Sequence, residues 1–357
     1  MLVERIRLSP VEAIERLSGL QAQFWLSPYL GLWTRLSNFQ RDALTRAIER
    51  FEVVKATLMR GTLHLVSARE YHQYEVAVSA RRFNTWLRVA RARDIVPEIK
   101  ALHKRTVEYA SVEPRSLDDM IEFTRKNAPA KGKWKPRYAV WNVVSSLGGF
   151  IRSPPSGTWG YYPSGDFMAA TSIISSKRKT NTEEAFTLVL RRYLASFGPA
   201  SREDLVKWSG IQISRFNSAI DALSPELTSF KDKSGHLLLD LVDGIRPEAD
   251  SSVPVRFLPK WDGVLLGYST STRDRVLPRK YYGKIIKVNG DVLPTVLVDG
   301  FVAGIWKHER KKGVAQLHVE LFEKLEDKSK SAIVREGRGL ISFIEPEAEK
   351  HEVVILD

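Results

Sequence analysis

The hydrophobic pattern of the first 96 residues predicts two helices, a β-hairpin and a long third helix. Residues 9–12, Ser-Pro-Val-Glu, are typical of a helix start, because the serine caps the helix and the glutamate completes a capping box. A second helix is predicted over 42–51, and two β-type runs over 53–59 and 63–66 follow it. This order is typical of a winged-helix unit, which we place at 1–96 together with the helix after the hairpin.

Two later segments predict a similar order of elements. Residues 97–174 predict a helix, a capped helix beginning at Ser116, a recognition helix and an aromatic wing at 151–162. Residues 182–248 predict a helix, a capped helix beginning at Ser201, a third helix and a hairpin. The basic stretch 175–181 between them is predicted to be an exposed linker or a phosphate-contacting loop.

Residues 249–357 change to β-type patterns. The predicted strands are 253–258, 283–288, 295–298, 301–306, 316–321 and 351–356, with a helix over 320–335. Asp299-Gly300 between two apolar runs is a strong hairpin signal. We therefore predict an α+β fold in which three tandem winged-helix units are followed by a small β-rich C-terminal domain.

Composition narrows the functional classes. The chain has 357 residues, no cysteine and a formal net charge of +13, which favours a polyanionic partner such as nucleic acid. The absence of cysteine excludes disulfides, thiolate nucleophiles and cysteine-ligated metal sites. The N-terminus has no signal-peptide pattern, and no apolar run reaches the about 18 residues that a bilayer requires. We expect a cytoplasmic, nucleoid-associated protein that does not act on membranes.

Several sequence motifs of catalysis are missing. The chain has no phosphate-binding P-loop, no Gly-x-Gly-x-x-Gly and no His-Glu-x-x-His, and its seven histidines are scattered. We therefore expect neither a metal nor a cofactor.

Gln21 and Gln23 are the most informative polar pair. On an extended backbone two residues two apart share a face, so both amides can contact the same water or base. An amide cannot ionise, so the pair can orient a nucleophile but cannot act as a strong base. The alternative is that both side chains cap a helix end.

Four segments carry a resemblance to a known family. They are residues 19–23 with Ser27-Pro28 and Arg35, residues 58–66, residues 194–210, and residues 258–268 with Arg275. In this order, and over nearly the whole chain, they resemble the tandem winged-helix DNA glycosylases of the AlkZ/YcaQ-like family. The family's catalytic block is Gln, an apolar residue, then Gln in the AlkZ branch or Asp in the YcaQ branch. With Gln21 and Gln23, this chain is similar to the AlkZ branch.

The resemblance implies a C-shaped clamp around double-stranded DNA that excises N7-alkylated purines, with interstrand crosslinks among the candidate lesions. It assigns Gln21 and Gln23 as the catalytic residues that hold the attacking water. Arg60 and His64 are expected nearby, and we expect a monomer. The predicted DNA-binding or supporting residues are Arg35, Arg60, Thr62, His64, Trp159, Tyr161, Lys177, Arg178 and Lys179.

Other interpretations remain open from sequence. His64 also fits a half-buried structural histidine, and Arg60 fits an ion pair with an acidic side chain. The arginines over 81–93 also fit a solvated helix face, and the tryptophans fit the core. A non-catalytic winged-helix DNA-binding protein, such as a regulator or nucleoid factor, accounts for the charge and the wings equally well. A winged-helix scaffold for protein partners would make the charge incidental.

Overall fold

The chain forms two compact units in the computed structural model, which describes residues 1–175, 180–248 and 250–356. Unit 1 comprises Met1–Leu8, Leu26–Gln40 and Ile245–Asp357, and unit 2 comprises Ser9–Trp25 and Arg41–Gly244. Of the described helices, none has the length and apolar character that a bilayer crossing needs.

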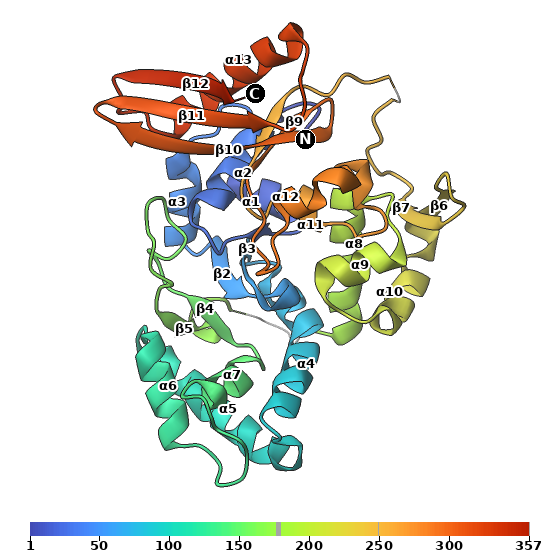
Figure 1. Cartoon of the computed structure of the whole chain (residues 1–357). Helices are drawn as coiled ribbons and strands as arrows, with labels where there is room; N and C mark the ends of the chain where they lie inside the picture. The colour runs from blue at the N-terminus through green and yellow to red at the C-terminus, as the bar shows by residue number, and fades with distance from the viewer. Residues whose placement is uncertain (176–179, 249, 357) are drawn as a thin grey trace. The chain divides into compact units, whose positions relative to one another are not determined.

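Unit 2 holds a five-stranded sheet of order β1-β3-β2-β4-β5 and a separate β6-β7 hairpin (Figure 1). The strands are β1 Leu20–Gln21, β2 Val53–Thr57, β3 Leu63–Ser67, β4 Phe150–Arg152, β5 Phe167–Ala169, β6 Leu227–Lys231 and β7 Leu237–Leu241. The helices are α1 Pro10–Arg16, α3 Arg41–Glu49, α4 Tyr71–Val89, α5 Val96–Val112, α6 Leu117–Lys126, α7 Ala139–Ser145, α8 Thr182–Phe197, α9 Arg202–Ser209 and α10 Asn217–Ala222. The hairpins predicted around Gly61 and around Ser234-Gly235 are confirmed.

Three helix starts follow the capping prediction. The side chains of Ser9, Ser116 and Ser201 each accept a hydrogen bond from the backbone N–H three residues on, and the acidic side chain there accepts one from the backbone N–H of the serine. This reciprocal capping satisfies two backbone donors at the starts of α1, α6 and α9.

One sheet combines strands from the first two predicted winged-helix segments. The β2-β3 hairpin runs antiparallel from Val53↔Ser67 to Thr57↔Leu63, and β4 joins β2 at Lys55↔Arg152. In Figure 1 the blue strands β2 and β3 and the green strands β4 and β5 therefore belong to one layer. Residues 53–67 and 150–169 are thus held together by backbone hydrogen bonds.

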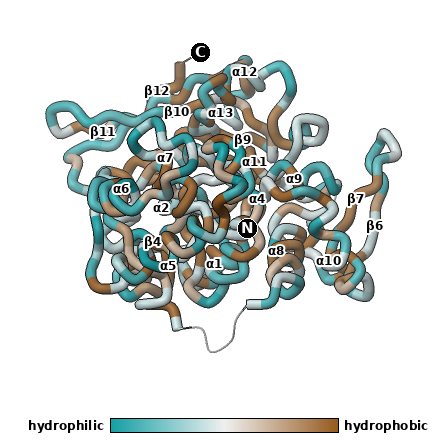
Figure 2. Tube along the Cα trace, turned by 90° about the horizontal axis from the view of Figure 1, so that it is seen from below, coloured by the Kyte–Doolittle hydropathy of each residue, from teal (hydrophilic) through white to brown (hydrophobic). Residues whose placement is uncertain are grey.

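The core of unit 2 includes the packing of α8 against α4. Tyr74 of α4 and Tyr193 of α8 are almost completely buried. The brown stretches along α8 and β7 in Figure 2 show the hydrophobic content of these elements. Arg192 donates hydrogen bonds to Glu70 and Glu15, which ties α8 to the segments before α4 and within α1. Burial raises the pKa of Glu70.

Unit 1 holds the second five-stranded sheet, of order β12-β11-β10-β9-β8. The strands are β8 Arg256–Leu258, β9 Thr295–Val298, β10 Phe301–Lys311, β11 Val314–Leu321 and β12 Lys350–Leu356. The helices are α2 Leu26–Arg35, α11 Gly263–Leu266, α12 Tyr282–Ile285 and α13 Asp327–Ile344. Helix α13 contacts β8, β11 and β12, and β12 runs parallel to β11.

Three predicted elements were wrong in type or position. Residues 282–285 form helix α12 instead of part of a strand, because a short apolar run fits either structure and Ile285 is buried from a helical turn. The helix predicted from Glu320 begins at Asp327, since Glu320 still pairs with Leu356 in the sheet. The helical spacing of Ile14, Leu17 and Leu20 predicts that the first helix includes Leu20, but α1 ends at Arg16 and Leu20 belongs to β1.

Candidate active site

The site is built on β1, which begins immediately after a sharp turn. Ser18 and Gly19 have φ values of +57° and +83°, and they redirect the chain from α1 into the strand. A Cβ on Gly19 would lie 3.0 Å from a Val66 side-chain carbon, so this close approach requires glycine. The backbone of Gln21 then lies opposite His64 of β3.

Gln21 and Gln23 contact each other directly. The Nε2 of Gln21 donates a hydrogen bond of 2.5 Å to the Oε1 of Gln23. Gln21 is half-buried, whereas Gln23 is exposed. The pair therefore joins an anchored amide to one that faces solvent.

Arg60 contacts the inner amide of this pair. Its Nη2 donates a hydrogen bond of 2.9 Å to the Oε1 of Gln21, and its Nη1 donates to the carbonyl oxygen of Trp208. Arg60 has a left-handed backbone with φ +55° and ψ +9° in the turn between β2 and β3. This turn carries the guanidinium to both acceptors.

Arg60 sets the orientation of both amides. Arginine only donates hydrogen bonds, so the oxygen of Gln21 must face Arg60 and its amino group must face Gln23. Gln23 must then present its oxygen to that amino group. Each amide oxygen keeps a second lone pair, so the pair can accept two hydrogen bonds from one water molecule.

His64 is the ionisable group on the strand beside Gln21. It is only 3% exposed, and its Nδ1 donates a hydrogen bond of 3.0 Å to the carbonyl oxygen of Thr62. Burial, followed by the charge of Arg60, lowers the pKa of His64 to about 3, although its bond to Thr62 acts the other way. His64 is therefore neutral at physiological pH. Thr62 itself donates from its hydroxyl to the Met59 carbonyl oxygen at 3.1 Å, which braces the turn.

An aromatic cluster lies immediately after the glutamines in sequence. The ring of Trp25 meets those of Trp159 and Tyr162 edge to face, with centroids 5.0 and 5.4 Å apart. The guanidinium of Arg41 lies 3.8 Å from the centre of the Trp159 ring. The predicted aromatic wing thus packs on the residue two positions after Gln23. Tyr161 is half-buried, and Tyr162 is 75% exposed.

The other predicted residues lie elsewhere. Arg35 belongs to unit 1, is 3% exposed, and donates two hydrogen bonds of 2.9 and 2.7 Å to the carboxylate of Asp262. Lys177, Arg178 and Lys179 lie outside the described residues. Among the described residues, no group of three or more His, Cys, Asp or Glu side chains is arranged to hold a metal ion.

Sequence reasoning missed two parts of this arrangement. It did not predict that Arg60 reaches the Trp208 carbonyl, since nothing local indicates a contact across 148 positions. It also did not connect Trp25 with Trp159, because nothing local indicates a ring contact across this distance in sequence. The arrangement can hold and orient a neutral nucleophile, but its amides offer no strong base.

Comparison with known proteins assigns the class. The family described as DNA glycosylase AlkZ-like matches residues 14–343. The chain therefore belongs to the DNA glycosylase AlkZ-like family, and it is a DNA glycosylase. This confirms the enzyme interpretation over that of a non-catalytic DNA-binding protein.

Two more specific similarities agree with this assignment. The interstrand DNA cross-link repair glycosylase of Streptomyces sahachiroi is 24% identical over 323 residues, which cover 86% of this chain and 84% of that protein. The solved structure of the Streptomyces sahachiroi DNA glycosylase AlkZ superposes with a TM-score of 0.81 at 21% identity. That match covers 99% of this chain and 95% of the other, and it confirms the mixed α+β fold.

Proposed function

We propose that the protein hydrolyses the N-glycosidic bond of N7-alkylated purines in double-stranded DNA, and that Gln21 and Gln23 position the attacking water. The observation that carries this proposal is the hydrogen-bonded amide pair, oriented by Arg60. The name of the Streptomyces sahachiroi relative supports interstrand crosslinks as substrates.

A neutral catalyst suits a cationic leaving group. Alkylation at N7 places a positive charge on the purine, which weakens the glycosidic bond and leads to an oxocarbenium-like sugar in the transition state. The remaining task is to place a water molecule correctly, and positioning alone can lower a barrier by about 7–11 kcal/mol in favourable cases. An unmodified purine lacks the charge and should resist the same site, so the weakness of the catalyst contributes to selectivity.

The geometry of the pair suggests how the water is held. A water that donates hydrogen bonds to the Oε1 atoms of Gln21 and Gln23 keeps its own lone pair available for the sugar carbon. The buried, neutral His64 adds no second positive charge beside the developing sugar cation. Arg60 acts on the amides and is a positioning residue in this scheme.

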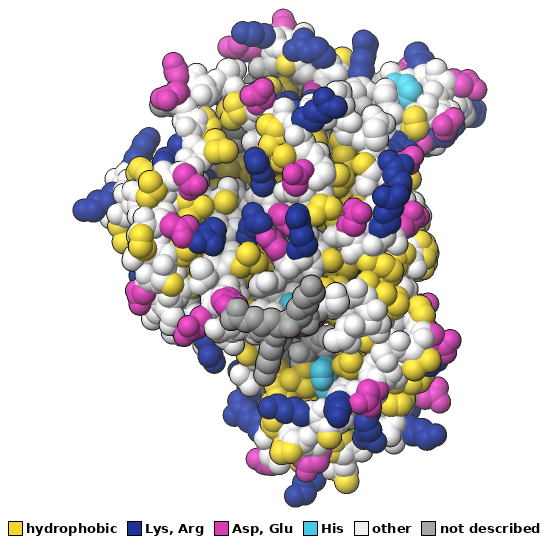
Figure 3. Space-filling view, turned by 180° about the vertical axis from the view of Figure 1, so that it is seen from behind, with side chains coloured by type: hydrophobic (Ala, Val, Ile, Leu, Met, Phe, Trp, Pro, Cys, Tyr) yellow, Lys and Arg dark blue, Asp and Glu magenta, His cyan; other side chains and the backbone are white. Residues whose placement is uncertain are grey.

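The larger architecture completes the proposal. Winged-helix units at 1–96, 97–174 and 182–248, followed by a β-rich domain at 249–357, would form a C-shaped clamp around duplex DNA as a monomer. On the face that Figure 3 shows, Lys and Arg side chains are interspersed with acidic ones instead of gathered in one patch. Trp159 and Tyr161 remain proposed DNA contacts, together with Lys177, Arg178 and Lys179.

A base-release assay tests the catalytic assignment. A duplex containing 7-methylguanine is incubated with the enzyme, and free base and alkali-labile abasic sites are measured. Gln21→Ala and Gln23→Ala should abolish release while DNA affinity and thermal unfolding stay close to those of the unmodified protein. Gln40→Ala, a change of the same type at an exposed position in unit 1, is the matched control. Undiminished release by both site variants would refute the role of the pair.

A further inference from the structure

A cavity of about 660 Å³ lies within unit 2. Its walls come from the turn after β2, from α4, from α7 and from β4. Its size falls within the range of about 300–1,000 Å³ that is typical of sites for small ligands. None of the glutamine side chains lines it.

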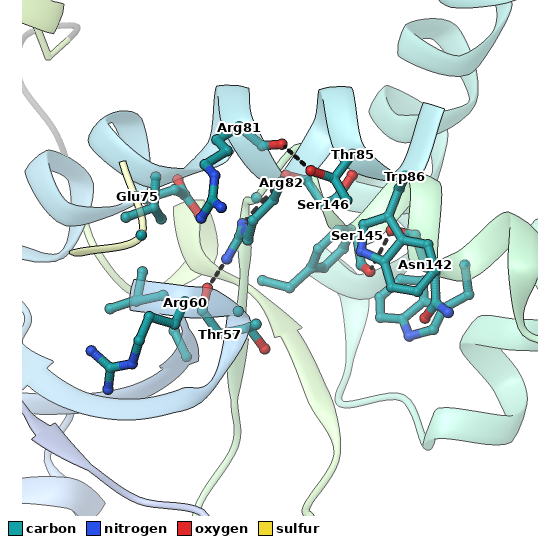
Figure 4. A pocket seen from close by; sticks show the side chains of 18 of the residues that line it. Thr57, Arg60, Glu75, Arg81, Arg82, Thr85, Trp86, Asn142, Ser145 and Ser146 are labelled. Atoms are coloured by element: carbon teal, nitrogen blue, oxygen red, sulfur yellow. Dashed lines mark hydrogen bonds between the residues drawn. The ribbon is translucent and has the colours of Figure 1, made fainter. Parts of the chain in front are cut away.

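One end of the cavity is cationic. Arg81 and Arg82 extend into it from α4, as Figure 4 shows, and Arg82 donates hydrogen bonds to the carbonyl oxygens of Thr57 and Ser146. Arg81 is exposed, and within the described part of the chain its guanidinium makes no hydrogen bond or ion pair. The one carboxylate in the wall, that of Glu75, accepts hydrogen bonds from the Tyr71 hydroxyl and the Gly149 backbone. Arg81 is thus available for an anion.

The other end of the cavity is aromatic. Figure 4 places Trp86 beside Asn142 and Ser145, on the side away from Arg81. Tyr138 lies four positions before Asn142 and also lines the cavity. Tyr138 is 50% exposed and Leu117, another lining residue, is 41% exposed, so apolar surface faces open space here. Flat apolar surface beside hydrogen-bonding amide and hydroxyl groups is suited to a nucleobase.

We propose that this cavity binds a single unpaired nucleotide of DNA, with its phosphate at Arg81 and its base against Tyr138 and Trp86. A nucleotide joins an anionic phosphate to an aromatic base, so its two parts match the two ends of the cavity. A DNA glycosylase that distorts a duplex exposes unpaired nucleotides of this kind. Arg60 lines the cavity, and its guanidinium also donates a hydrogen bond to Gln21. One side chain, that of Arg60, therefore connects the cavity with the proposed catalytic pair. The proposal does not depend on the roles of Gln21 and Gln23.

Binding of a short single strand tests this site. A single-stranded deoxythymidine trinucleotide is titrated into the full-length protein by calorimetry at fixed salt. Arg81→Gln should weaken binding about tenfold, as expected for loss of one charged hydrogen bond. Tyr138→Ala should weaken it about fivefold or more through lost stacking, and Tyr138→Phe should retain the affinity because the ring remains.

A control substitution of another arginine on the same helix distinguishes a specific binding site from general electrostatic attraction between the protein and the strand. Arg88 is exposed in the last turn of α4 and does not line the cavity, so Arg88→Gln should bind the trinucleotide almost as well as the unmodified protein. Equal losses in Arg81→Gln and Arg88→Gln would overturn the proposal, as would undiminished binding by Tyr138→Ala. This experiment measures binding and not base release. The proposed nucleotide site and the proposed catalytic pair can therefore be refuted independently of each other.

Discussion

Arg60 donates a hydrogen bond of 2.9 Å to the side-chain oxygen of Gln21, and this contact determines which way both amides of the pair point. A cation therefore lies next to an uncharged pair of amides. Because its second hydrogen-bonding arm holds the Trp208 carbonyl, the guanidinium is fixed at two points.

Replacing Arg60 should impair catalysis more than DNA binding. In Arg60→Met the amide of Gln21 can turn over, and a misplaced water of this kind can lower the rate about 100-fold. Arg60→Lys keeps the charge but cannot span both acceptors. Its rate should therefore lie between that of Arg60→Met and that of the unmodified protein. Single-turnover base release at saturating enzyme reports the chemical step. A normal rate combined with weaker DNA binding would instead identify Arg60 as a phosphate contact.

Gln23→Asp should remain active and accept a wider range of alkylated purines. The carboxylate can still accept the hydrogen bond from Gln21, and unlike an amide it stabilises the developing sugar cation and can act as a base. Release from duplexes that carry different alkylated purines measures the change. An inactive variant that still folds and binds DNA would show that the amide itself is required at this position.

His64 should make the protein less stable in mild acid. The folded protein holds the pKa of His64 at about 3, whereas the pKa of an unperturbed histidine is about 6.5, so below pH 6.5 the unfolded chain binds a proton that the folded chain does not. Stability is therefore lost as the pH falls from 6.5 towards 3, and by pH 5 the cost is about 2 kcal/mol.

His64→Gln removes this proton linkage, so its free energy of unfolding should depend less on pH in this window. Urea unfolding at pH 7.5 and at pH 5 gives the difference for each protein. Equal pH dependence in the His64 variant would show that another group controls acid stability.

Arg35 and Asp262 should act in folding and not in contact with DNA. Both side chains are almost completely buried, and Asp262 also caps α11 through the Val264 backbone. Arg35→Met leaves a buried carboxylate without its partner, which should cost about 3–5 kcal/mol of stability. Below the unfolding transition, the salt dependence of DNA binding should not change. A shallower dependence would mean that Arg35 neutralises a phosphate.

Sequence patterns predicted the helix starts and hairpins well because their causes are local. A capping box needs only residues three apart, and the turn at Asp299-Gly300 lies between strands that pair directly, Val298 with Phe301. Where the cause was not local, prediction failed. The apolar stretch at 283–288 fitted both a strand and a helix, and only its packing in unit 1, where Ile285 is fully buried, decided for a short helix.

In the candidate site, too, the features with local causes were predicted and those that depend on tertiary packing were not. Gln21 and Gln23 were predicted as a pair because residues two apart on an extended chain share a face, and the structure places their amides in contact. The contact of Arg60 with Trp208 was not predictable, since it depends on how α9 packs near the turn after β2. Gly210 permits that packing, because a Cβ there would lie 3.3 Å from the Arg60 Cα.

The contact between Arg60 and Trp208 also has a consequence for protein synthesis. A nascent chain that has passed the glutamines and Arg60 still lacks the carbonyl that holds the guanidinium, because that carbonyl comes 148 positions later. We expect such a fragment, or a product of proteolysis cut before α9, to release bases more slowly than the full chain, because its Arg60 lacks the Trp208 contact that helps to hold the guanidinium.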